Sequence, residues 1–396
     1  MSGRGQPSLT RARIADSPLV PIVVAQLFGT SLWFSANSAA DDLMLAWGMT
    51  LADIGTLTNA VQIGFITGTL IFSITGLADR FPASRIFSVC AITGAALNAS
   101  FVFFAQGLAG GMLIRFLVGL CLAGIYPLGM KLVVSWMPDK AGAALAWLVG
   151  MLTLGISLPH GFRALGGGLP WQWPLLLASA LAALAACMIH ALGDGPHLKR
   201  VQHGVKWGDV FRTFSIPAFR ASALGYFGHQ WELYAFWALI PALLSLMQMA
   251  QPASAAQSMS AFVIIGVGAA GCVLGGVLSR RIGSARVAAL ALAGSVVCCA
   301  LFPFAVGWPL WCKWLLLLVW SVSAIADSPH YSALSAKACP PQMVGSALAF
   351  QNAVGFAITV VSIQLGMKWV GDMGVHVAWF LLPGPLLGLV GLRRLL

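Results

Sequence analysis

Two pairs of ionisable residues lie inside apolar stretches of the sequence. Glu232, the only glutamate in the chain, follows His229 by three positions, and Asp327 precedes His330 by three. Residues three apart share one face of a helix. A carboxylic acid inside hydrocarbon is costly and indicates a functional site by default. Because histidine can exchange a proton near neutral pH, both pairs indicate proton coupling.

Two other interpretations of these pairs stay open. Imidazole and carboxylate ligands suit divalent transition metals, although the sequence shows no dense cluster of such ligands. Each acid could instead pair with a basic residue of a neighbouring helix. Pro329, between Asp327 and His330, frees backbone carbonyls that could meet a ligand or bend the helix.

The composition explains why buried charges are unusual in this chain. Hydrophobic residues make up 59% and charged residues 8%, with a mean hydropathy of +0.88, whereas soluble domains carry about 25% charged residues. The sequence therefore predicts an integral membrane protein that contacts the lipid bilayer. Nearly all basic residues fall in short loops between apolar runs, which excludes a nucleic-acid partner despite the net charge of +11. The eight cysteines form no CxxC motif, so we expect neither a disulfide framework nor a zinc site.

Twelve apolar runs are each long enough to cross the hydrocarbon core, which takes about 20 helical residues. The sequence therefore predicts an all-α fold of twelve transmembrane helices. The expected spans are residues 19–40, 55–77, 86–105, 107–133, 141–163, 172–192, 219–247, 258–279, 285–306, 308–335, 343–369 and 372–392.

The basic residues set the orientation of these spans. Of the 22 lysines and arginines, Arg163, Lys313 and Lys368 fall on one side and Arg115 falls inside a span, while the others lie in the two tails and the even-numbered loops. The positive-inside rule then places both termini in the cytoplasm. We expect a multi-pass protein of the cell inner membrane.

A repeat at a spacing of about 200 residues divides the chain. The segment GAALAW from Gly142 matches GSALAF from Gly345, and Pro127 matches Pro329. Matches in the same order predict two six-helix bundles related by pseudo-symmetry. The predicted parts are a cytoplasmic tail (1–18), a first bundle (19–192), a cytoplasmic linker (193–218) and a second bundle (219–396).

Two motifs resemble the major facilitator superfamily. The loop GLADRFPASR from Gly76 resembles the family signature GxLaDRxGrk, and a weaker copy, GVLSRRIGSAR, begins at Gly276. Pro82 and Ser84 depart from the signature, as does Ser279 in the second copy. The resemblance implies a conformational switch at these loops, formed by Gly76, Asp79, Arg80, Arg85, Arg280 and Arg281.

The fourth span carries RFLVG from Arg115, which resembles the family's RxxxG helix, whose arginine is linked to proton coupling there. The stretches GHQWELYAFW and ADSPHYSAL are similar to bacterial facilitators near the nitrate/nitrite and cyanate-type permeases. The resemblance implies secondary transport, in which two halves rock around a central site. The chain shows no Walker-type motif and its loops are too short for a catalytic domain, so we expect no enzyme activity.

Periodicity and the repeat together select candidate site residues. One face of the first helix carries a stripe of residues spaced 4, 3 and 4, namely Gln26, Thr30, Trp33 and Asn37. The repeat offset of 199 residues maps this stripe onto Gly225, His229, Glu232 and Phe236. In the family's architecture these two helices line the central cavity. The expected solute contacts are Gln26, Thr30, Trp33, Asn37, His330 and Tyr331. The expected proton-coupling residues are Glu232, His229, Asp327 and Arg115.

Two points of this assignment stay open. Gln26 and Asn37 could simply form bonds across a helix contact. Arg115 needs a partner in its apolar span, for which Asp41, Asp42 or an anionic substrate are candidates.

The sequence as a whole predicts a monomeric, proton-coupled secondary transporter of a small solute, with no cofactor. Transport of a transition metal or metal chelate is one alternative. A non-transporting sensor and an intramembrane enzyme on the same scaffold are others, and import and export are equally open.

Overall fold

The computed structural model describes residues 17–197, 213–340 and 344–396, and these residues form helices and no strand. The first half contains α2 (Leu19–Thr30), α3 (Ala40–Trp47), α4 (Leu51–Thr75), α5 (Leu77–Arg80), α6 (Ala83–Phe104), α7 (Leu108–Trp136), α8 (Ala141–Leu165) and α9 (Gln172–Leu192). The second half contains α11 (Pro217–Leu246), α12 (Ala255–Ile282), α13 (Ser284–Leu301), α14 (Leu310–Ala326), α15 (Ser328–Ala338), α16 (Val344–Met373), α17 (Val377–Leu381) and α18 (Pro383–Leu392).

The predicted all-α membrane fold is confirmed. Within the described residues, nine helical stretches are long and apolar enough to cross a membrane, and one of them, residues 347–392, holds two successive spans. The shorter α2 and the long α11 complete the twelve. Each predicted span coincides with a helix or an interrupted helix, and the span boundaries differ by a few residues.

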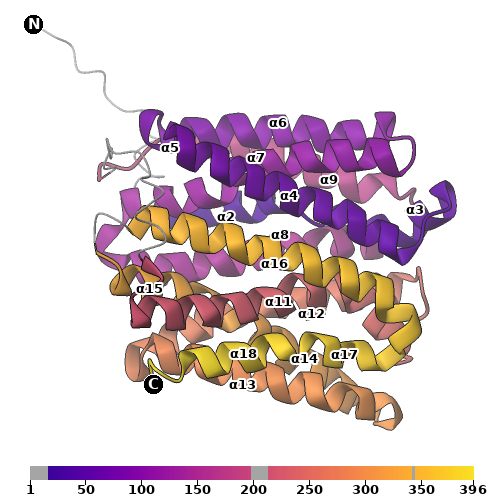
Figure 1. Ribbon diagram of the computed structural model, residues 1–396. Coiled ribbons are helices and arrows are strands. Elements are labelled where there is room, and N and C mark those ends of the chain that lie inside the picture. The colour runs from indigo at the N-terminus through magenta and orange to yellow at the C-terminus, as the bar shows by residue number, and fades with distance from the viewer. Residues whose placement is uncertain (1–16, 198–212, 341–343) are drawn as a thin grey trace, which may run out of the picture.

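The helices of the two halves lie on opposite sides of the bundle, the first half above and the second below in Figure 1. Contacts of α8 with α12 and of α4 with α16 join them. We call the end that carries α3 the distal end, and the end that carries α5 and the last residues of α18 the proximal end. Residues 1–16 and 198–212, in the predicted tail and linker, lie outside the described residues, so the domain limits stay a prediction.

Glycines let α4 and α7 approach closely. A Cβ atom added to Gly64 would lie 2.0 Å from the Phe116 carbonyl oxygen, and one added to Gly119 would lie 2.2 Å from the Val61 carbonyl oxygen. Gly68 makes a similar approach to Ala123. Membrane helices pack through such small residues, and Gly64 and Gly68, four positions apart, form this packing contact between α4 and α7.

We expect Gly64→Ala to destabilise the protein by about 1–3 kcal/mol, because overpacking forces backbone to shift. Gly142→Ala is the matched control, since its added Cβ would meet no atom within 4 Å. Thermal melting of the detergent-purified protein checks the difference. Equal melting temperatures for the two variants would contradict the contact.

Candidate functional site

Two hollows lie between the halves. The central cavity has a volume of about 60 Å³ and is lined by residues of α7, α8, α11, α14, α15 and α16. The distal pocket has a volume of about 270 Å³ and lies between the distal ends of both halves. On α11, Trp237 lines the central cavity and Ala238 lines the distal pocket, so the two hollows follow each other along the bundle.

Three of the four tyrosines of the chain line the central cavity. These are Tyr126, Tyr226 and Tyr234. The ring centroid of the fourth, Tyr331, lies 6.0 Å from that of Tyr226. Polar lining is added by Gln230, Asn352, Ser328 and Ser332. Aromatic rings with a few hydroxyl and amide groups are typical of a site for a small organic molecule.

The helix face of α11 that lines this cavity differs from the predicted stripe. The cavity face carries Tyr226, Gln230, Tyr234 and Trp237, whereas the repeat predicted His229 and its helical neighbours. A shift of one residue turns a helix face by about 100°. A sequence signal for this face exists. Tyrosine is rare in the chain, and Tyr226, Gln230, Tyr234 and Trp237 are spaced 4, 4 and 3 along α11, which places them on one helix face.

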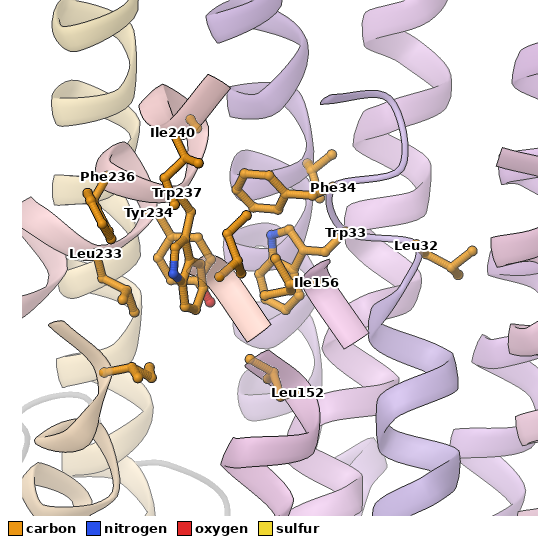
Figure 2. Close-up of a cluster of buried hydrophobic side chains, with 14 of the residues drawn as sticks. Leu32, Trp33, Phe34, Leu152, Ile156, Leu233, Tyr234, Phe236, Trp237 and Ile240 are labelled. Carbon is orange, nitrogen blue, oxygen red and sulfur yellow. The ribbon is translucent and has the colours of Figure 1, made fainter. Parts of the chain in front are cut away.

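Aromatic side chains close the space between the halves (Figure 2). The ring centroid of Trp33 lies 4.9 Å from that of Phe65, 5.6 Å from that of Tyr234 and 5.9 Å from that of Phe356. Trp33 Nε1 donates to Gln62 Oε1 at 3.1 Å. We call Trp33, Phe65, Tyr234 and Phe356 the aromatic plug. The predicted solute contact Trp33 therefore packs between the two halves, and its role in solute binding stays a prediction.

A buried ionisable network lies directly behind the cavity wall. His229 Nδ1 lies 2.8 Å from Asp327 Oδ1, and both side chains are 1% exposed. The two atoms are at ion-pair distance without the alignment of a hydrogen bond. The Tyr331 hydroxyl donates to Asp327 Oδ2 at 2.9 Å. The structure therefore pairs the histidine of α11 with the acid that follows α14, in place of the two pairs expected within single helices.

Glu232 lies deeper in the second half. Its Oε1 accepts from Trp320 Nε1 at 2.6 Å and from the Cys299 thiol at 3.6 Å, so α13 and α14 enclose it. His330 is buried against α12, with its Nε2 3.3 Å from the position of a Cβ added to Gly275. The helix break at Pro329 is confirmed, since α14 ends at Ala326 and α15 begins at Ser328.

Arg115 stabilises a helix break in the first span. The α2 helix ends at Thr30, and residues 31–36 form turns. The fully buried guanidinium donates to Ser35 Oγ at 3.0 Å, Asn98 Oδ1 at 2.9 Å and Leu32 O at 3.0 Å. It also donates to the carbonyl of Trp33. Backbone freed inside a membrane needs such partners, so the arginine and the break stabilise each other.

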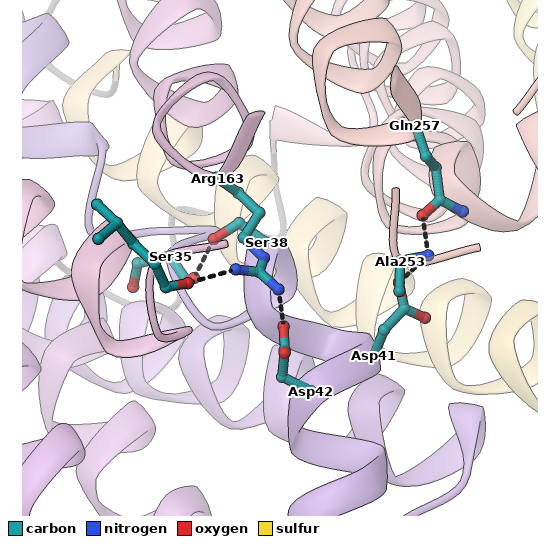
Figure 3. Close-up of polar contacts among 8 residues, drawn as sticks. Ser35, Ser38, Asp41, Asp42, Arg163, Ala253 and Gln257 are labelled. Atoms are coloured by element: carbon teal, nitrogen blue, oxygen red, sulfur yellow. Dashed lines mark hydrogen bonds and ion pairs between the residues drawn. The ribbon is translucent and has the colours of Figure 1, made fainter. Parts of the chain in front are cut away.

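The prediction that Asp41 or Asp42 pairs with Arg115 is wrong. Asp42 instead accepts from Arg163 at 2.7 Å, and Asp41 accepts from the Ala253 N–H at 3.1 Å (Figure 3). Both acids lie on α3 beyond the break. The residue that could have indicated the partner of Arg115 is Asn98, a polar residue inside the apolar helix α6. Its amide also donates to Leu175 O and Ser179 Oγ.

The other predicted solute contacts on the first span do not share one face, because the helix ends between them. The Gln26 amide is buried without a hydrogen-bond partner and its Oε1 lies beside Gly129. Thr30 Oγ1 donates to Gln26 O and to Leu152 O. Asn37 donates to Thr58 Oγ1 at 2.8 Å and lines the distal pocket. Their role in solute binding stays a prediction.

The predicted switch loops lie at the proximal end. Gly76 ends α4 with a φ of +65°, a conformation that suits glycine. The Lys131 ammonium donates to Ala78 O and so ties the loop to α7. The side chain of Asp79 lies outside the described residues. The predicted switch arginines 80, 85, 280 and 281 are exposed.

The described residues contain no group of three or more His, Cys, Asp or Glu side chains that could hold a metal ion. The network of His229 and Asp327 offers one imidazole and one carboxylate, and Glu232 bonds elsewhere.

Apolar helices in two halves, a cavity between the halves and buried ionisable groups behind its wall are typical of multi-span membrane carriers. The chain belongs to the Major Facilitator Superfamily, whose family model matches residues 22–363. The predicted family is thereby confirmed.

Two curated relatives resemble parts of the chain. The niacin transporter NiaP of Acinetobacter baylyi (strain ATCC 33305 / BD413 / ADP1) is 32% identical over 141 residues, which cover 32% of this chain and 31% of that protein. NiaP of Bacillus subtilis (strain 168), assigned as a niacin/nicotinamide transporter, is 26% identical over 163 residues, which cover 39% and 38%. The chain thus matches about a third of the length of each relative.

Two solved structures share the fold over nearly the whole chain. A bacterial homologue of the human lysosomal transporter Spinster, in an inward-facing and unoccupied conformation, gives a TM-score of 0.68 at 14% identity and covers 98% of this chain and 95% of its own. A mutant of the nucleoside transporter NupG gives a TM-score of 0.70 at 15% identity, with 95% and 98% covered. At these identities the likeness shows the fold alone.

Proposed function

We propose that this protein is a monomeric secondary transporter that carries a small aromatic solute by alternating access through the central cavity. The observation that carries the proposal is the cavity itself, which lies between the two halves and draws its lining from both. At about 60 Å³ it is far below the roughly 300–1,000 Å³ of a ligand pocket. Solute binding therefore requires the halves to separate at the aromatic plug.

The lining favours a planar aromatic ring with polar substituents. Tyr126, Tyr226, Tyr234 and Trp237 offer ring faces and edges for stacking. Gln230 and Asn352 offer amide groups that can donate to a carboxylate or carboxamide. The curated relatives are named for niacin and nicotinamide, which have this chemistry, so niacin and nicotinamide are the first solutes to test.

We further propose that the proton gradient drives transport through the buried acids. The ring centroid of Tyr226, a cavity residue, lies 6.1 Å from that of His229, and the Gln230 amide donates to the Tyr226 hydroxyl at 2.9 Å. A proton on the pair of Asp327 and His229 is therefore separated from the proposed solute by the ring of Tyr226. Glu232, one helical turn along α11 from His229, is the proposed second proton carrier. Low local dielectric strengthens the effect of each charge on its neighbours.

The exposed arginines at the proximal end support the proposed orientation. Arg80 ends α5, Arg85 lies in the first turn of α6, and Arg280 and Arg281 lie in the last turn of α12, whose end lies beside the last residues of the chain. The positive-inside rule places such an end in the cytoplasm. We therefore propose an inner-membrane location with both termini cytoplasmic.

The proposal is tested by solute binding to purified protein. We expect niacin or nicotinamide to raise the melting temperature, since a ligand that binds the native state alone stabilises it. Tyr234→Leu should weaken that binding about tenfold, which corresponds to 1.4 kcal/mol, because it removes a ring that lines the cavity. Phe104→Leu is the control, since that ring is 74% exposed at the distal end of α6. A Tyr234→Leu variant that binds as tightly as the control would contradict the assigned cavity.

A further inference from the structure

The distal pocket has the composition of a second ligand site. Its volume of about 270 Å³ approaches that of small-molecule pockets. Apolar side chains form most of its wall, among them Met44, Ile54, Leu246, Met367 and Val370. Polar groups line it from both halves: Asn37, Ser38, Asp41 and His160 from the first, and Ser245, Gln257 and Ser258 from the second.

One of these polar groups is buried and unpartnered. His160 lines the pocket from α8, is 3% exposed, and its Nε2 has no hydrogen-bond partner. A buried polar atom without a partner is costly. In the neutral imidazole protonated at Nδ1, Nε2 is an acceptor, so a donor group on a ligand would satisfy it.

The charge of the pocket is set by Asp41. Its neighbour Asp42 is neutralised by Arg163 at 2.7 Å, and the lining of the pocket within the described residues contains no lysine or arginine. Asp41 Oδ2 accepts from the Ala253 N–H at 3.1 Å, and the same N–H also donates to Gln257 Oε1 at 3.0 Å (Figure 3). A ligand can therefore form a hydrogen bond to Asp41 in place of the Ala253 N–H, because that N–H retains its hydrogen bond to Gln257.

We propose that the distal pocket binds a small organic ammonium ion with an apolar body. A primary ammonium has three N–H donors, and the lining offers as acceptors the Asp41 carboxylate, the Nε2 of His160 and the side-chain oxygens of Asn37 and Ser38. The apolar body packs against the methionine and aliphatic wall. An anion is disfavoured, because the described lining contains the Asp41 carboxylate and neither lysine nor arginine.

This site has a consequence for the contact between the halves. Asp41 belongs to the first half, and Ala253 and Gln257 belong to the second. An ammonium ion that takes Asp41 removes one of the hydrogen bonds that join the halves at the distal end. Ligand binding thereby exchanges a hydrogen bond between the halves for contacts between the ligand and both halves.

Titration calorimetry of the full chain in detergent tests the site, with benzylammonium as probe and benzoate as its anionic counterpart. We expect benzylammonium to bind with an affinity that depends on Asp41. Benzoate, an aromatic carboxylate of the kind proposed for the central cavity, should show no binding that depends on Asp41. Asp41→Asn should weaken benzylammonium at least about tenfold, because it removes a charge-assisted bond, while its amide oxygen can still accept from the Ala253 N–H. Asp42→Asn, the neighbouring acid already paired with Arg163, should bind within about twofold of the wild type.

A second variant tests the site without changing a charge or a hydrogen bond, so that a folding defect of Asp41→Asn would not leave the test undecided. Gly371 lines the pocket on α16, and a Cβ added there would meet no atom within 4 Å, so Gly371→Leu is expected to fill the pocket and weaken benzylammonium at least about tenfold. Tyr234→Leu, in the central cavity, should leave this binding unchanged, which separates the distal site from the proposed solute site. The proposal is overturned if benzylammonium does not bind, if Asp41→Asn weakens benzoate as much as benzylammonium, or if Asp41→Asn and Gly371→Leu bind benzylammonium as the wild type does.

Discussion

Asp327→Asn is expected to abolish uptake driven by a pH gradient while solute exchange continues. The amide keeps the size of the side chain and can still accept from the Tyr331 hydroxyl, which now donates to Asp327 at 2.9 Å, but it cannot take up a proton. Uptake into proteoliposomes under an imposed pH gradient should fall to the level of protein-free liposomes. Counterflow of labelled solute, which needs no net proton movement, should persist.

Two further variants sharpen this prediction. Asp372→Asn is the control, because that acid is exposed at the distal end of α16. Glu232→Gln should show the same loss as Asp327→Asn, because both acids are proposed to carry the proton. If only one of the two variants loses proton dependence, that acid acts alone and the two-acid relay is wrong.

Arg115→Met is expected to prevent stable folding of the protein. The side chain is fully buried and satisfies the carbonyls of Leu32 and Trp33 at the break in the first span, together with the side chains of Ser35 and Asn98. Each buried acceptor left without a donor costs about 1–3 kcal/mol, and domains are stable by only about 5–15 kcal/mol. Size-exclusion chromatography after detergent extraction should show a large loss of monodisperse protein.

The control for this prediction is Arg85→Met, because that arginine is exposed at the proximal end. Arg115→Lys should give an intermediate loss, since one ammonium cannot reproduce the planar, forked donors of a guanidinium. If Arg115→Met elutes and melts as the wild type does, the arginine does not hold the break.

The helices were predictable from the sequence because their signal is local. A run of about 20 apolar residues has one stable structure in a bilayer, so the spans and the break at Pro329 follow from composition and chain stiffness. The close approach at Gly64 was predictable for the same reason, because the spacing of small residues is visible within one helix.

The site was harder to predict because it depends on rotation and on contacts between distant segments. Rotating α11 by one residue exchanges His229 for Gln230 at the cavity, and a repeat made of short matches does not fix a helix to that precision. Nothing in the sequence near Arg115 shows that its partners are the carbonyls at 32 and 33 and the amide of Asn98. The pairing of His229 with Asp327, 98 positions apart, is likewise visible only in three dimensions.

The most direct test of the central claim is uptake of labelled niacin and nicotinamide into proteoliposomes that contain the purified protein. With the exterior more acidic than the lumen, we expect accumulation of at least one of these solutes above the level in protein-free liposomes, and collapse of the gradient by a protonophore should abolish it. Accumulation that is indifferent to the protonophore, or no accumulation of either solute above the protein-free level, would contradict a proton-coupled carrier of small aromatic solutes.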